Sequence, residues 1–160
     1  MTRRILYIVT SIIAMIGCDY ALSAQEVDMM LFNRDVNGIE IGRTMTKGQV
    51  IEYFGNPSKY EYSPSDDGDN ELYYYNGSYL HFKGNIFIGF CIRDTKFSTI
   101  TNHIQGGLKI NDSLSKLDNF VYGVPKPYQE GYILFYSSDN PMYLLVKDGI
   151  IIGIDYSDPL

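Results

Sequence analysis

The chain has 160 residues, a formal net charge of −6 and a sequence pI of about 4.8, with 15 tyrosines, 8 phenylalanines and no tryptophan. Phosphate backbones repel an acidic surface, so the charge argues against a nucleic-acid partner and favours a basic one. Two cysteines in the whole sequence exclude a small fold that depends on several disulfides.

The first 24 residues are predicted to be a signal peptide. Arg3 and Arg4 give it a basic start, and residues 5–16 are almost wholly apolar but too short to span a bilayer. Small residues before position 25 fit cleavage after Ala24. Such cleavage would place the protein in the periplasm or outside the cell, and residues 25–38 would form its N-terminal segment.

A second processing route stays open. Residues 15–18 resemble a loose lipoprotein box, and cleavage there would leave Cys18 acylated and the protein anchored to a membrane. Cleavage after residue 24 would instead leave Cys91 as the remaining cysteine. An internal disulfide could not then form, so the core alone would hold the fold.

Three sequence blocks occur twice in the same order, which predicts an internal repeat. The paired blocks are 42–47 with 111–116, 54–57 with 122–125, and 82–86 with 146–150. We therefore expect a first α+β repeat over 39–93, a connector over 94–106 and a second α+β repeat over 107–160.

Each repeat is predicted to open with a short helix. Residues 46–49 and 115–118 have the spacing of a capping box, in which two side chains satisfy free backbone N–H groups of the first turn. Glycine and proline at 55–57 and 123–125 are typical helix stops.

Antiparallel strands are predicted to follow each helix, because alternating apolar residues are separated by tight-turn pairs. The expected strands are 71–75, 79–82, 86–93, 132–136, 142–146 and 150–155, with an additional edge strand over 59–62. The predicted fold class is α+β, with two tandem helix-plus-antiparallel-meander repeats and the helices packed on one face of the sheet.

Alternation along these strands assigns residues to two faces. The core set begins with Leu72, Tyr74, Leu80 and Phe82. The opposite face is rich in aromatic rings, which offer large contact area at low entropic cost. We expect this face to be the binding surface, with Tyr73, Tyr75, Tyr79, His81, Phe87, Tyr132, Tyr136 and Tyr143 as its binding residues.

The blocks at 42–50 and 54–57 resemble the opening of the BamE (SmpA/OmlA) family of envelope lipoproteins, and 82–86 is similar to a later block of that family. Two such units in tandem resemble the BLIP-like (β-lactamase inhibitor protein-like) superfamily. The resemblance implies a helix layer on an antiparallel sheet. In the inhibitor a curved sheet offers an aromatic face to a protein enzyme, so by analogy the tyrosine face would bind here.

Catalytic and metal-binding patterns are weak. His81, His103 and Cys91 are the only candidates for a nucleophile–base pair, and neither a strand-to-helix elbow nor an oxyanion loop accompanies them. The acidic run 66–71 lacks the spacing of an EF-hand loop. We therefore expect no enzyme activity, no cofactor and no metal.

The predicted function is a secreted or periplasmic protein-binding module, similar in role to an inhibitor or an immunity protein. The expected partner is another protein, such as an envelope enzyme, a toxin or an assembly component. The alternative is a lipid-anchored accessory of outer-membrane or envelope assembly, and acylation of Cys18 would distinguish the two. A carbohydrate ligand on the tyrosine face also stays open.

Overall fold

The computed structural model describes residues 25–28, 34–101, 104–117, 131–136 and 142–157, with backbone only at 25–28, 132–136 and 157. Several predictions therefore lie outside the described residues. They are the signal segment and Cys18, His103, the capping residue Asp118, and the helix stop at 123–125.

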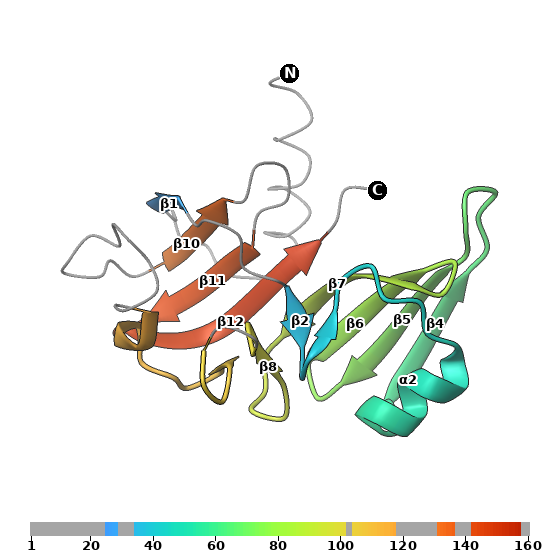
Figure 1. Cartoon of the computed structure of the whole chain (residues 1–160), viewed down its shortest axis with the longest axis horizontal. Coiled ribbons are helices and arrows are strands. Elements are labelled where there is room, and N and C mark those ends of the chain that lie inside the picture. Colours follow the sequence, from blue (N-terminus) through green and yellow to red (C-terminus); the bar gives the residue numbers. More distant parts are fainter. Residues whose placement is uncertain (1–24, 29–33, 102–103, 118–130, 137–141, 158–160) are drawn as a thin grey trace, which may run out of the picture.

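One eight-stranded sheet dominates the structure (Figure 1), with the strand order β1-β10-β11-β12-β7-β6-β5-β4. All neighbours are antiparallel except β1, which runs parallel to β10. The strands are β1 (Gln25–Asp28), β4 (Lys59–Ser63), β5 (Asn70–Tyr75), β6 (Ser78–Lys83), β7 (Ile86–Ile92), β10 (Gly131–Tyr136), β11 (Met142–Lys147) and β12 (Ile150–Ser157). Each strand predicted from the sequence is present, with slightly different ends.

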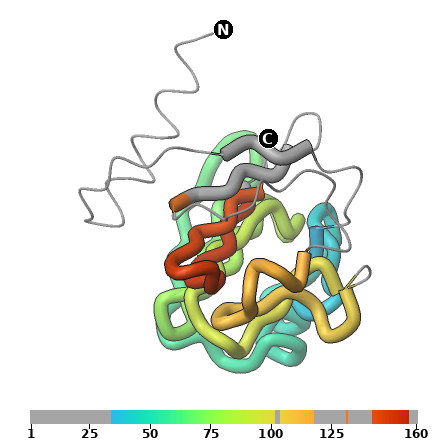
Figure 2. The backbone as a smooth tube through the Cα atoms, turned by 90° about the vertical axis from the view of Figure 1, so that its left-hand side faces the viewer, coloured from blue at the N-terminus to red at the C-terminus, as the bar shows by residue number. Residues whose placement is uncertain are grey.

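Shorter elements complete the described part of the chain. They are α2 (Lys47–Phe54), the 3₁₀ helix η1 (Leu114–Leu117), the hairpin of β2 (Asp35–Val36) with β3 (Ile39–Glu40), and the hairpin of β8 (Ser98–Thr99) with β9 (Leu108–Lys109). The two hairpins are neighbours, because Asn37 N donates to Ser98 O at 2.8 Å. Figure 2 shows the cyan β2–β3 segment beside the yellow connector.

The predicted α+β fold class is wrong. Among the described residues α2 is the one α-helix, only eight residues long, and the rest is mostly β-structure in a single sheet. Thr46 caps α2 as expected: its hydroxyl accepts from Gln49 N at 3.3 Å, and its own N–H donates to Gln49 Oε1 at 2.8 Å. In the second half Ser115 N instead donates to the Ser113 hydroxyl at 3.3 Å, so Ser115 lies inside a 3₁₀ turn rather than before an α-helix.

What the two halves share is not a helix. In each half, three backbone hydrogen bonds tie the segment before the meander to the tight turn of its last hairpin. The first half has the bonds Gly42 N to Phe87 O, Phe87 N to Arg43 O and Met45 N to Asn85 O. The second half has Asn111 N to Ile151 O, Ile151 N to Asp112 O and Leu114 N to Gly149 O. The paired blocks 42–47 with 111–116 and 82–86 with 146–150 therefore occupy matching places at the ends of two three-stranded meanders, whereas 122–125 lies outside the described residues.

The meanders β5–β7 and β10–β12 join at the centre of the sheet. There β7 pairs with β12, and Phe90 lies opposite Tyr156. Each meander contains a register shift, one between His81 and Phe82 and the other between Leu145 and Val146. These shifts change which residues face the core.

A single hydrophobic core lies on one face of the sheet. Every helix and hairpin that the structure describes outside the sheet contributes to it, and burying each large side chain stabilises the fold by about 1.5–3 kcal/mol. The core includes Val50 and Phe54 of α2, Val36 and Leu108 of the hairpins, Leu114 and Leu117 of η1, and Leu80, Phe82, Phe90, Ile92, Leu144, Val146 and Ile154 of the sheet.

Candidate functional site

The β5–β6 turn decides which tyrosines reach the core. Residues 76–77 both have positive φ, 46° and 87°, as a type I′ hairpin turn requires, and Tyr75 pairs with Ser78. Tyr73 therefore lies opposite Leu80, and residues directly opposite in antiparallel strands share a face.

The predicted exposure of Tyr73 and Tyr75 is consequently wrong. Tyr73 is 1% exposed, and its hydroxyl donates to Glu71 Oε2 at 2.7 Å. Tyr75 is buried as well, and its hydroxyl donates to the Gly55 carbonyl at the end of α2 at 3.2 Å. Both rings hold the covered face together, so neither belongs to an exposed surface.

Phe87 also lies in the core, contrary to prediction. The register shift in β6–β7 places it opposite Phe82 and leaves His81 opposite Gly89. Phe87 is 0% exposed and its ring stacks on Phe82 with centroids 5.0 Å apart. One extra residue in the ladder thus moves Phe87 to the covered face.

The remaining predicted binding residues divide into two groups. Tyr79, His81 and Tyr143 are half-buried and lie on the face of the sheet away from the core. Tyr132 and Tyr136 lie in β10, where the structure describes backbone only. The structure therefore brings three predicted side chains to one face and leaves two undescribed.

We call this second surface the open face and define it by strand pairing. One row crosses six strands, and a second row lies beside it on four strands. The first row contains Lys59, Tyr74, Tyr79, Cys91, Asp155 and Tyr143, and the second contains Glu61, Leu72, His81 and Gly89. Most of these side chains are half-buried, whereas their neighbours along β5, β6, β7, β11 and β12 are buried; on the edge strand β4 the neighbours Tyr60 and Tyr62 stay partly or largely exposed.

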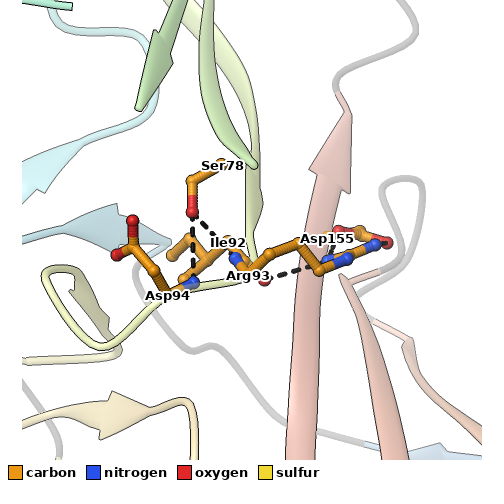
Figure 3. A network of polar contacts seen from close by, with 5 residues as sticks. All are labelled: Ser78, Ile92, Arg93, Asp94 and Asp155. Carbon is orange, nitrogen blue, oxygen red and sulfur yellow. Dashed lines mark hydrogen bonds and ion pairs between the residues drawn. The ribbon is translucent and has the colours of Figure 1, made fainter. Parts of the chain in front are cut away.

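An ion pair joins the two meanders at the centre of the open face (Figure 3). The Arg93 guanidinium donates to both carboxylate oxygens of Asp155, at 2.5 and 2.6 Å, and the two side chains are 23% and 16% exposed. The backbone N–H groups of Arg93 and Asp94 both donate to the Ser78 hydroxyl, at 2.8 and 3.3 Å. The Ser78 hydroxyl therefore fixes the backbone after β7 at Arg93, the residue whose side chain carries the guanidinium.

Gly153 leaves room for this guanidinium. A Cβ added at Gly153 would lie 2.8 Å from Nη1 of Arg93 and 3.1 Å from Cβ of Leu145. Real Cβ atoms are essentially never found that close to another heavy atom. The glycine thus lets the long arginine side chain lie flat across β12 towards Asp155.

Cys91 lies between Tyr79 and Asp155 in the first row of the open face. Burial, the nearby Asp155 carboxylate and a hydrogen bond to it raise the pKa of the Cys91 thiol. The thiol is therefore protonated near neutral pH, and a protonated thiol is a poor nucleophile. His81 lies 3.2 Å from Asn70 Oδ1 through Nε2, so its ring is oriented by an amide.

The tyrosines of the open face stay neutral and can donate hydrogen bonds. Burial raises the pKa of both Tyr79 and Tyr74 to about 12, with the nearby Cys91 and Glu61 as additional causes respectively. The Tyr74 hydroxyl donates to Glu61 Oε2 at 2.8 Å. Burial also lowers the pKa of His81, so this ring is neutral near pH 7. The face therefore combines neutral rings with two ion pairs, Arg93 with Asp155 and Lys59 with Glu61.

The acidic loop after β4 uses its carboxylates in contacts within the chain. Asp67 forms an ion pair with Lys83 at 2.6 Å, which lowers the pKa of Asp67 to about 2. Asp69 accepts from the Tyr62 hydroxyl at 2.6 Å. Across the described residues, no three His, Cys, Asp or Glu side chains form a group that could hold a metal ion.

Within the part of the chain that the structure describes, no helix has the length and apolar character needed to cross a membrane.

Comparison with known proteins gives no family model that matches the chain, and no significant match among curated proteins or solved structures. The resemblance to BamE and BLIP-like proteins therefore stays a prediction. The properties of the site rest on its own geometry.

Sequence reasoning missed Tyr74, Arg93 and Asp155. The signal for Tyr74 was present, because a two-residue turn at 76–77 already pairs Tyr74 with Tyr79. No local pattern identifies the ion pair, since its partners are 62 positions apart and meet only through the pairing of β7 with β12.

Proposed function

We propose that this chain is a protein-binding module that acts outside the cytoplasm and uses the open face of its sheet to contact another protein. The observation that supports this most is the asymmetry of the sheet. One face is sealed under α2, η1 and both hairpins, whereas the other leaves Tyr74, Tyr79 and Tyr143 only half-buried. The apolar segment at the start of the sequence supports export.

The chemistry of the open face suits recognition of a protein. Tyrosine and arginine are the side chains enriched at binding hot spots, because they combine a large contact area with directed hydrogen bonds. Tyr79 lies on β6 and Arg93 directly follows the adjacent strand β7, and Arg93 is already oriented by Asp155. A side chain held in place before binding loses less conformational entropy when a partner arrives.

Site-specific photo-cross-linking tests this proposal in cells that make the protein. A photoreactive phenylalanine analogue would replace Tyr79 on the open face, and a matched variant would carry it at Tyr53. Tyr53 is 51% exposed on α2, away from the open face. We expect a discrete adduct with one protein from position 79 and none from position 53. Equal adducts from both positions, or none from 79 in folded protein, would refute the proposed surface.

A further inference from the structure

The outer edge of β4 has no strand partner among the residues that the structure describes. The sheet order ends at β4, which pairs with β5 alone among the described residues, and Figure 1 shows it at the margin of the sheet. Proteins commonly protect such edges with lysine and other charges, proline or bulges, and the one lysine of β4, Lys59, is held in an ion pair with Glu61. The β4–β5 ladder has neither a register shift nor a proline between Lys59 and Ser63. Its edge is regular enough to accept another strand.

The rings at this edge already attract ammonium groups from the same chain. Lys47 Nζ lies 3.5 Å from the ring centroid of Tyr60, whose hydroxyl donates to Glu71 Oε2 at 2.7 Å. Lys59 Nζ lies 5.3 Å from the ring centroid of Tyr74, whose hydroxyl donates to Glu61. In both places an ammonium group lies over a tyrosine ring whose hydroxyl donates to a carboxylate.

Tyr62 repeats this arrangement without a lysine. Its hydroxyl donates to Asp69 Oδ2 at 2.6 Å, its side chain lies on the free edge strand, and it is 55% exposed. No described lysine or arginine lies over its ring, and Asp66 adds negative charge in the adjoining loop, where Lys83 already balances the charge of Asp67. The vacant ring and the acidic loop complement a basic side chain.

We infer that β4 binds an extended, lysine- or arginine-bearing segment of another protein, which adds a strand to the sheet. Backbone hydrogen bonds along β4 would supply affinity, and a basic side chain over Tyr62 and beside Asp69 would supply specificity. The overall charge of −6 favours the approach of such a partner. This surface is the edge of the sheet, so the inference stands or falls separately from the open face.

A labelled peptide of alternating threonine and lysine is the probe, and fluorescence anisotropy measures its binding to the full chain. We expect the peptide to bind, and its copy with glutamate in place of lysine to fail. Methylation of alternate backbone nitrogens removes strand pairing while keeping the charge. We expect it to weaken binding at least about tenfold, as loss of several backbone hydrogen bonds predicts.

Two variants locate the site. Tyr62→Leu combined with Asp69→Asn should weaken binding about fivefold, whereas Tyr53→Leu, at the other exposed tyrosine among the described residues, should leave it unchanged. Thermal unfolding checks that both variants fold, and hydrogen exchange should show new protection of the β4 amides in the wild type. Absent binding, equal binding of the glutamate or methylated peptides, or protection elsewhere would overturn the inference. Self-association that protects β4 in sedimentation and exchange experiments would also overturn it, because a second copy would then occupy the edge.

Discussion

The two faces of the sheet hold neighbouring tyrosines in different environments. On the covered face Tyr73 is buried with its ring against Tyr60 and Phe82 of the adjacent strands, and it donates to the buried Glu71. On the open face Tyr74 remains half-buried and donates to Glu61, whose side chain is 42% exposed. The tyrosine content of a strand therefore does not by itself mark a binding surface. The face of each ring decides whether it stabilises the fold or can meet a partner.

The largest expected loss of stability comes from a substitution in the core on the covered face. Tyr73→Ala should lower the free energy of unfolding by about 4 kcal/mol, because it empties a core site and removes a donor to Glu71. Tyr74→Ala, one residue along, should cost only about 1 kcal/mol. Urea unfolding measures both values. Equal losses in the two variants would show that the faces are not different in the way the structure describes.

The next effect concerns the ion pair that joins the meanders on the open face. Arg93→Met should cost about 2 kcal/mol, because it leaves the Asp155 carboxylate without its main partner in a half-buried place. Asp155→Asn is the reciprocal variant. In a double-mutant cycle the combined variant should lose less than the sum of the single losses. Additive losses would mean that the two groups do not interact in solution.

A smaller loss of stability is expected from filling the space that Gly153 leaves for the Arg93 side chain on β12. Gly153→Ala should cost about 1–2 kcal/mol, since the new methyl group meets the Arg93 guanidinium and must displace it. Gly48→Ala in α2 is a suitable control, because its nearest neighbour would be Thr46 Oγ1 at 3.9 Å. That control should be neutral or slightly stabilising, as alanine favours helix over glycine. A neutral Gly153→Ala would place the guanidinium elsewhere.

The smallest effect is a pH dependence from the open face. Burial and the nearby Lys83 lower the pKa of His81 below its ordinary value of 6.5, so below that pH the unfolded chain binds more protons than the folded one. Stability is thus present above pH 6.5 and declines as the pH falls. Urea midpoints at about pH 7.5 and about pH 5.5 measure it. His81→Gln should reduce the decline, and an unchanged decline would exclude His81 as its source.

Local sequence signals predicted the strands and the first helix well. Alternation and tight-turn pairs located β5, β6 and β7, and the capping box at Thr46 and Gln49 is present. These features depend on residues close together in the chain, and for that reason they are visible in the sequence. Two of the three repeated block pairs, 42–47 with 111–116 and 82–86 with 146–150, likewise make matching backbone hydrogen bonds.

The predicted faces and the predicted start of the second helix at Ser115 were wrong for physical reasons. The face of Tyr73 follows from the two-residue turn at 76–77, because the length of the turn fixes the pairing register of β5 with β6, which the hydrophobic pattern alone did not give. The face of Phe87 follows from a register shift that alternation cannot detect. In the second half the Ser113 hydroxyl accepts the backbone N–H of Ser115, and Leu114–Leu117 form a 3₁₀ turn. The ion pair of Arg93 and Asp155 depends on long-range pairing.

The most direct test of the open face measures how tightly the protein cross-linked at position 79 binds to purified variants. Tyr74→Ala and Tyr79→Ala together should weaken that binding at least about tenfold while the fold stays intact, as expected for aromatic residues at the centre of an interface. Tyr53→Ala, on α2, should leave it unchanged. Unchanged affinity in the folded double variant would contradict the assignment of the open face as the binding surface.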